Sequence, residues 1–202
     1  MSSENSCFAL LKRLTQSLAV ALGERDRNTR QHSERVVELS LELGRHCDFS
    51  GRELDVLALG AEFHDVGKIG IPDRVLQKPA AFDEDEWATM KQHPLIGERI
   101  LCAIDTDEAH EAAQVVRHHH EHYDGSGYPD GLAGDRIPVY SRIVSLADSY
   151  DAIAITRPYH KARLHRQIMD ILHAEVGIKH DPDLLHAFCA VIERSGRRAP
   201  DA

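Results

Sequence analysis

The sequence of 202 residues lacks long apolar runs and lacks an excess of basic charge, and each absence excludes a class of protein. No stretch approaches the roughly 18 apolar residues of a membrane span. Residues 1–14 lack the basic start and the apolar stretch of a secretory signal. The formal net charge of -9 argues against a general nucleic-acid binder, which needs a basic face. We therefore expect a cytoplasmic protein that binds neither duplex nucleic acid nor a membrane.

Cysteine pairs and aromatic residues are also scarce. The four cysteines stand far apart with no CxxC spacing, so we expect buried, reduced thiols and neither disulfides nor a thiolate zinc site. Aromatic residues make up only 5%, so the core must be built from Leu, Ile, Val and Ala. Histidine, by contrast, occurs 14 times, and histidine is the commonest metal ligand. The histidines are therefore the first candidates for a functional site.

Apolar residues recur at helical spacing along almost the whole chain. The pattern predicts helices over 6–23, 30–47, 52–65, 83–91, 94–103, 107–122, 139–153, 162–175 and 182–194. Glycine and proline break the pattern at 67–73 and make 123–138 a long loop, and long loops are often functional. No convincing strand alternation is present. We expect an all-α fold, a single compact bundle of about seven to eight helices, with an N-terminal helix within 1–24 and a flexible tail over 195–202.

Histidines and aspartates recur on five separate segments, 26 to 32 residues apart. The series is His32, His64 with Asp65, His93, His119 with His120, and Asp148. This interval fits one residue or pair on each helix of a bundle, all pointing inward. Imidazole and carboxylate ligands suit Fe, Mn or Zn, and seven ligands are too many for one tetrahedral zinc. The series therefore predicts two metals that share a bridging carboxylate.

Six segments carry motifs of a known family. They are QHSERV (31–36), HDVGKIGIPD (64–73), KQHPLIGERIL (91–101), HHEHYDGSGYPDGL (119–132), ADSYDA (147–152) and RPYHKA (157–162). Together they closely resemble the HD-GYP family of bacterial cyclic di-GMP phosphodiesterases, a branch of the HD metal-dependent phosphohydrolases. A His-Asp dipeptide alone is common, but HDxGK, HP and HHExxDGxGYP in this order and spacing are specific. The resemblance implies a catalytic domain of the HD type over 25–194.

The resemblance assigns metal-binding and catalytic roles residue by residue. The first metal's ligands match His32, His64, Asp65 and Asp148. The second metal's ligands match His93, His119 and His120. Asp65 matches the bridging carboxylate, and Lys68 matches a lysine that faces the scissile phosphate, so both are the expected catalytic residues. The implied cofactors are two divalent ions, Fe or Mn foremost, with Zn, Ni and Mg as alternatives.

Substrate binding is also implied by the resemblance. The matching positions are Lys68, Gly125, Gly127, Tyr128, Pro129, Arg157 and His160. The glycines let backbone N–H groups approach phosphate closely, and Tyr128 can stack on a guanine or form the pocket wall. Arg157 matches a basic residue that contacts substrate, whereas His160 replaces the usual Lys or Arg. Asn28 stands where some members carry a glutamate that helps to bind a third metal, so we expect two metals and not three.

Several polar residues near these motifs have open alternatives. His118 is expected to face the helix surface or to orient a ligand. Glu121 and Asp124 either orient the histidines or serve the helix end and the turn. Asp151 is a candidate brace for the helix that carries Asp148. The histidines outside the motif series, including His180, are expected at the surface or as satisfied core residues.

The expected reaction is hydrolysis of cyclic di-GMP to pGpG, with GMP after a second cleavage, by attack of a metal-bridging hydroxide. Two other functions fit the same residues. One is the same chemistry on another cyclic dinucleotide such as cyclic GMP-AMP. The other is a weakly active or non-catalytic signalling module that binds a protein partner. A homodimer formed through residues 6–23, or a separate regulatory protein, would complete the expected partners.

Overall fold

The computed structural model describes Val20, residues 27–154 and residues 163–201. Every named element in these ranges is a helix, and the one β pairing among them is an isolated bridge between Val176 and His180. The expectation of an all-α fold is confirmed. The helix predicted over 6–23 lies outside the described residues, apart from Val20. No helix in the described part of the chain combines the length and apolarity that crossing a membrane requires.

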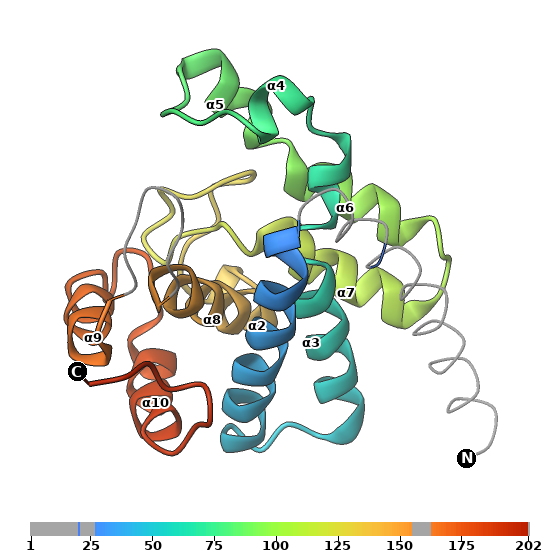
Figure 1. The fold of residues 1–202 in the computed structure, drawn as a ribbon. Helices are drawn as coiled ribbons and strands as arrows, with labels where there is room; N and C mark the ends of the chain where they lie inside the picture. The colour runs from blue at the N-terminus through green and yellow to red at the C-terminus, as the bar shows by residue number, and fades with distance from the viewer. Residues whose placement is uncertain (1–19, 21–26, 155–162, 202) are drawn as a thin grey trace.

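The larger apolar core lies among α2 (Arg27–His46), α3 (Gly51–Phe63), α8 (Val139–Ala154), α9 (His165–Ala174) and α10 (Pro182–Ile192). Its fully buried side chains include Leu39, Leu57, Leu146 and Phe188. Most of these residues are aliphatic, as the low aromatic content requires. α2 packs along both α3 and α8, so these three helices form the frame of the bundle (Figure 1).

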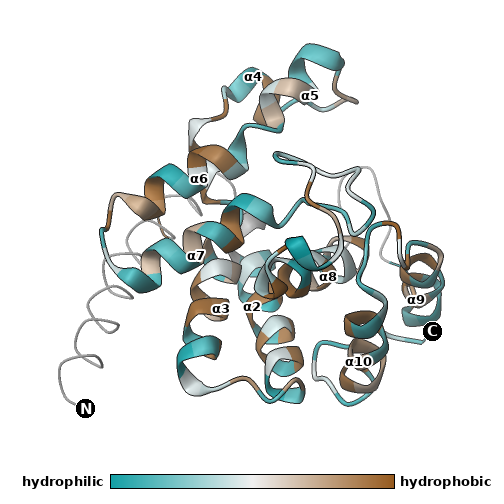
Figure 2. Ribbon diagram, turned by 180° about the vertical axis from the view of Figure 1, so that it is seen from behind, coloured by the Kyte–Doolittle hydropathy of each residue, from teal (hydrophilic) through white to brown (hydrophobic). Residues whose placement is uncertain are grey.

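A second apolar core joins α6 (His93–Cys102) and α7 (Asp107–His118) to the other side of α3. Figure 2 shows polar and apolar residues alternating along α6 and α7, as expected for helices with one buried face. Phe63, Leu101 and Val116 are fully buried in this core. Because α3 contributes to both cores, its C-terminal end lies where the two helical layers meet.

A small hairpin projects from one end of the bundle and consists of α4 (Asp73–Leu76) and α5 (Glu84–Met90) (Figure 1). Its own apolar cluster contains Ile71, Val75 and Met90. Asp83 caps α5 by accepting the backbone N–H of Glu86, which is the helix start that an acidic first turn favours. The hairpin therefore has its own local contacts and leads directly into α6.

Two predicted boundaries differ from the structure. The helix predicted over 107–122 ends at His118, so His119 and His120 follow the helix. The tail predicted to be flexible packs on the bundle: Ala199 is buried, and its amide donates to the Tyr150 hydroxyl at 2.9 Å. The Pro200 carbonyl also accepts the backbone N–H of His165 at 2.9 Å. These contacts join residues far apart in sequence, so local composition could not reveal them.

Candidate metal centre

Two groups of side chains in the described residues are arranged to hold a metal ion. The first contains His32, His64 and Asp148, from α2, the end of α3 and α8. The second contains His93, His119 and His120, from the start of α6 and the segment after α7. Within each group the ligand atoms all lie within 4.8 Å of one another. The fold thus brings together six of the seven predicted ligands, in the two sets that the resemblance implies.

Asp65, the seventh predicted ligand, lies between the two groups. One carboxylate oxygen is 3.6 Å from His64 Nε2, and the other is 3.5 Å from His93 Nε2. The carboxylate therefore faces both groups, as a bridging ligand must. Lys68 follows one turn later, with Nζ 2.5 Å from Asp65 Oδ2.

The backbone changes direction at His64 and Asp65, because α3 ends at Phe63. His64 still has helical angles, whereas Asp65 has φ -99° and ψ 3° and starts a 3₁₀ turn, η1 (Val66–Gly70). Neighbouring side chains on a regular helix point about 100° apart, so the change of helix type lets His64 and Asp65 face the same site. Gly67 permits the close contact with α6, because a Cβ there would lie 1.8 Å from the His93 carbonyl oxygen.

Three ligand imidazoles are oriented by the same backbone contact. Nδ1 of His64, His93 and His119 lies 2.7, 2.8 and 2.6 Å from the carbonyl oxygen three residues earlier. Since a carbonyl only accepts, Nδ1 carries the proton and Nε2 presents a lone pair to the site. Metal-binding histidines are held in this way in many proteins.

The imidazole nitrogens that face the site are suited to bind a cation. His64 Nε2 is buried and has no hydrogen-bond partner in the protein. His93 Nε2 and His119 Nε2 face each other at 3.4 Å, although both are acceptors once Nδ1 holds the proton. Buried polar atoms are almost always satisfied, and one metal at each ligand group would satisfy these three nitrogens. The donor set of imidazole and carboxylate, without thiolate, suits Fe, Mn or Zn.

His32 is positioned by two carboxylates. Its Nδ1 is 2.6 Å from Asp151 Oδ2, and its Nε2 is 3.1 Å from Asp148 Oδ1. Burial alone would lower the pKa of His32, but the contacts with Asp148 and Asp151 outweigh burial and raise the pKa to about 9. Asp151 also accepts the Arg35 Nε hydrogen at 2.6 Å. Asp151 therefore orients a predicted ligand and links α8 to α2.

The imidazole pKa values of the second group shift downward, opposite to that of His32 in the first group. Burial is the largest cause that lowers the pKa of His93 to about 4 and that of His120 to about 3, and the Lys68 ammonium acts in the same direction. Burial also lowers the pKa of His119 well below its usual value. Burial alone would raise the pKa of Asp65, but Lys68 and the surrounding histidines hold it well below its ordinary range. At neutral pH the second group and Asp65 therefore present neutral imidazoles and an ionised carboxylate, which are the forms that bind metals.

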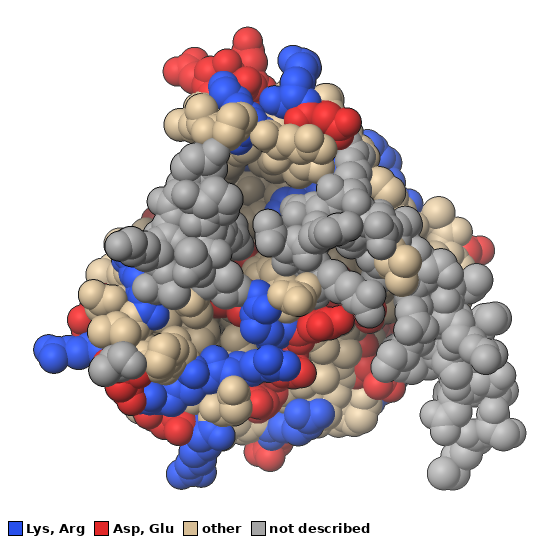
Figure 3. Space-filling view, in the orientation of Figure 1, with Lys and Arg blue, Asp and Glu red and all other residues tan. Residues whose placement is uncertain are grey.

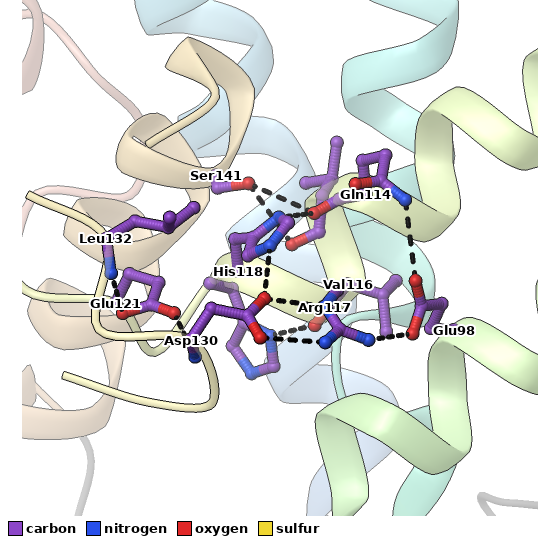
Figure 4. Close-up of polar contacts among 11 residues, drawn as sticks. Glu98, Gln114, Val116, Arg117, His118, Glu121, Asp130, Leu132 and Ser141 are labelled. Atoms are coloured by element: carbon purple, nitrogen blue, oxygen red, sulfur yellow. Dashed lines mark hydrogen bonds and ion pairs between the residues drawn. The ribbon is translucent and has the colours of Figure 1, made fainter. Parts of the chain in front are cut away.

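The glycine-rich loop over 123–138 is fastened to α7 by a polar network (Figure 4). The Glu121 carboxylate accepts the backbone N–H groups of Asp130 at 2.7 Å and Leu132 at 3.1 Å. The Asp130 carboxylate in turn accepts from Arg117 Nε at 2.7 Å and lies 2.9 Å from His118 Nε2. His118 therefore belongs to this network and to neither ligand group. Glu121 anchors the loop and does not orient a histidine, and Asp124 caps a turn by accepting the Ser126 N–H.

The loop folds back against the second ligand group. A Cβ on Gly127 would lie 2.2 Å from the His122 backbone nitrogen, so only glycine fits this approach. Tyr128 donates its N–H to the His120 carbonyl at 3.2 Å, and its ring stacks on His120 with centroids 4.9 Å apart. Gly125, with φ 87°, and Pro129 shape the same loop. Arg157 and His160 lie outside the described residues, and so does the side chain of Asn28.

His180 is a residue whose environment the sequence did not reveal. It is only 2% exposed, and neither ring nitrogen makes a hydrogen bond, although Nε2 lies 3.2 Å from a Glu175 oxygen. Its segment pairs with the loop, because Tyr123 and Asp124 donate their N–H groups to the carbonyls of Lys179 and Ile178. The expectation of a surface or satisfied histidine is wrong here. No local pattern distinguishes His180 from the exposed histidines around it.

Comparison with known proteins gives a consistent result. Residues 15–184 match the family model described as HD domain. The chain is 39% identical over 170 residues to the cyclic di-GMP phosphodiesterase response regulator RpfG of Xanthomonas campestris, covering 84% of this chain and 45% of that protein. It is 37% identical over 174 residues to the 3'3'-cGAMP-specific phosphodiesterase 2 of Vibrio cholerae, covering 86% of this chain and 33% of that protein. The chain thus spans less than half the length of these relatives.

A solved structure supports the same fold. The cyclic GMP-AMP specific phosphodiesterase V-cGAP3 of V. cholerae superimposes with a TM-score of 0.64 at 20% identity, over 82% of this chain and 44% of that one. At this identity the likeness concerns the fold alone.

Proposed function

The chain belongs to the HD-domain family, and we propose that it is a metal-dependent phosphodiesterase that hydrolyses cyclic di-GMP. The product is pGpG, with GMP after a second cleavage. The observation that carries this proposal is the position of Asp65, which faces two separate groups of imidazole and carboxylate ligands and also contacts Lys68. Relatives named cyclic di-GMP phosphodiesterases favour this substrate.

The proposed cofactors are two divalent cations, Fe or Mn. His32, His64 and Asp148 would hold one, His93, His119 and His120 the other, and Asp65 both. When bound, such a pair supplies a nucleophile from water at neutral pH and neutralises phosphoryl oxygens. The acidic chain, with a net charge of -9, is compatible with an anionic substrate because the cations and Lys68 make the site locally positive.

The residues of the chain supply positioning and charge. Asp65 holds the Lys68 ammonium at 2.5 Å, where it can stabilise the negative charge that grows on a phosphoryl group. The loop held by Glu121 places Tyr128 beside the second ligand group. Tyr128 forms a wall against His120 and shields it from water. Arg157 and His160 are proposed as further contacts for phosphate or base.

A second substrate is supported by the relatives named 3'3'-cGAMP-specific phosphodiesterases. The two substrates differ in one base, so the metal centre treats their phosphodiesters alike. Competition kinetics with both cyclic dinucleotides separates them, because the ratio of kcat/KM values gives the preference directly. A non-catalytic signalling role is less well supported, since all seven ligand positions and Lys68 are present.

The test is turnover of cyclic di-GMP by protein purified without oxygen and supplied with Fe or Mn. We expect pGpG or GMP to appear and about two metals per chain. The Asp65→Ala variant should lose both metal loading and turnover. Asp170→Ala, an exposed aspartate on α9, is the matched control and should behave like the parent. Full turnover by Asp65→Ala would contradict the assignment, and a loaded parent protein without product would contradict the proposed reaction.

A further inference from the structure

A row of aromatic rings leads from the second ligand group to the surface. Tyr128 stacks on His120, and Trp87 of α5 meets Tyr128 edge to face, with centroids 6.2 Å apart and planes at 77°. Phe82 stacks on Trp87 at 6.1 Å and 21°. The row thus connects the hairpin of α4 and α5 with the metal centre. Figure 3 shows the surface hollowed beneath this hairpin.

Trp87 is not needed to fill the core. The apolar cluster of the hairpin is made by Ile71, Val75 and Met90, with Phe82 and Ile96 packed against it, and Trp87 is not a member. The Trp87 side chain is 45% exposed, one of few large apolar side chains so placed among the described residues. An exposed indole is a favourable stacking surface, because its face is apolar and electron-rich.

A single cation accompanies both rings. Lys91 Nζ lies 6.0 Å from the ring centroid of Trp87 and 6.0 Å from that of Tyr128. The Lys91 ammonium therefore lies equally close to the two rings. A flat, electron-rich heterocycle that stacks on Trp87 would bring its edge acceptors toward this lysine. Guanine presents two acceptors on one edge, O6 and N7, and lysine is a common partner of that edge.

We propose that Trp87, Tyr128 and Lys91 form a purine subsite that takes one base of the cyclic dinucleotide, preferring guanine; this inference rests on the proposed function. Stacking of the base on Trp87 supplies affinity, and Lys91 supplies the preference for guanine. In a nucleotide the base is one sugar away from the phosphate. Trp87 lies one ring beyond Tyr128, which itself stacks on the predicted ligand His120, so the subsite adjoins the candidate metal centre.

The chain contains a single tryptophan, so its fluorescence reports on this subsite alone. Stopped-flow mixing of the metal-loaded parent protein with cyclic di-GMP should give a saturable quench before turnover. Inorganic phosphate, which has no base, should give none. The same titration with cyclic di-AMP should require a higher concentration, and Lys91→Met should remove most of that difference.

Steady-state kinetics provide the second readout. Trp87→Leu should raise KM for cyclic di-GMP about tenfold, the order expected for one stacked base, with kcat changed less than twofold. Trp87→Phe keeps a ring and should restore most of the affinity. Val176→Ala, an exposed apolar side chain outside the ring row, is the control and should leave KM unchanged. Metal content and Tm should match in all variants.

The outcomes separate the two proposals. If the parent hydrolyses cyclic di-GMP but Trp87→Leu keeps its KM, or no quench occurs, the subsite is refuted and the proposed function stands. A fall in kcat at constant KM would also refute a role in base binding. If the parent shows a saturable quench with cyclic di-GMP but hydrolyses no cyclic dinucleotide, the proposed function fails and the subsite is supported.

Discussion

At the scale of single residues, the candidate site depends on pairing polar and charged groups whose burial alone would destabilise the folded protein. A buried carboxylate is destabilising unless it is hydrogen-bonded or paired with charge. Asp65, 5% exposed, has Lys68 on one side and the imidazoles of His64 and His93 on the others. The backbone carbonyls that hold each imidazole are local, three residues earlier in the chain. His64, His93 and His119 are thus each oriented by their own segment, and only their convergence on one site requires the fold.

Asp151→Asn tests the orientation of a ligand by a residue outside the ligand groups. Asp151 accepts from both His32 Nδ1 and Arg35, so the neutral amide should weaken the hold on His32 and reduce its basicity. We expect metal affinity of the first group to fall about 10- to 100-fold, measured by competition with a chelator. Asp170→Asn should leave it unchanged. Equal affinity in the Asp151 variant would show that His32 needs no such support.

At the scale of elements, apolar periodicity was enough to predict α2, α3, α6, α8 and α10 within a few residues. It could not predict where α7 stops. The sequence after His118 continues with helix-compatible residues, but Glu121 instead binds loop amides nine and eleven residues ahead. Gly127 then packs against His122. These contacts depend on how the loop folds back, and the helical pattern carries no information about them.

Glu121→Gln tests how the loop is held. The variant keeps the size of the side chain but loses one acceptor, so one half-buried N–H group of the loop loses its partner. We expect the free energy of unfolding to fall by about 1–3 kcal/mol and the exchange of the Leu132 amide to accelerate. Glu84→Gln, exposed in the first turn of α5, should change stability by less than about 0.5 kcal/mol. Equal stability of the two variants would contradict the anchoring role.

At the scale of the whole molecule, the two apolar cores meet at α3, and the ligand groups lie where they meet. The sequence motifs predicted the ligands because each motif lies within one short segment and contains the ligand residues themselves. They did not predict the ring row through Trp87, the burial of His180 or the docking of the C-terminal segment on Tyr150. Each of these depends on segments that approach only after the helices pack.

The burial of His180 predicts a dependence of stability on pH. Burial, followed by the charge of Lys179, lowers the pKa of His180 to about 3 in the folded protein, against 6.5 ordinarily. Below pH 6.5 the unfolded chain takes up a proton that the folded protein excludes, so stability falls until pH approaches 3. At pH 5 the cost is about 2 kcal/mol.

His180→Phe removes this titration. The free energy of unfolding of His180→Phe relative to the parent should therefore rise by about 2 kcal/mol between pH 7.5 and pH 5, measured by urea unfolding. Taking the difference between the two proteins cancels the contribution of the other histidines. A difference that stays constant with pH would show that His180 titrates normally in the folded state.

The most direct test of the account is the position of bound metal in a crystal of the protein loaded with Mn or Fe, located by anomalous diffraction. A dinuclear centre on Asp65 predicts two peaks on either side of its carboxylate, one beside His32, His64 and Asp148 and the other beside His93, His119 and His120. A single peak, or two peaks that do not share Asp65, would contradict a dinuclear centre built on this residue.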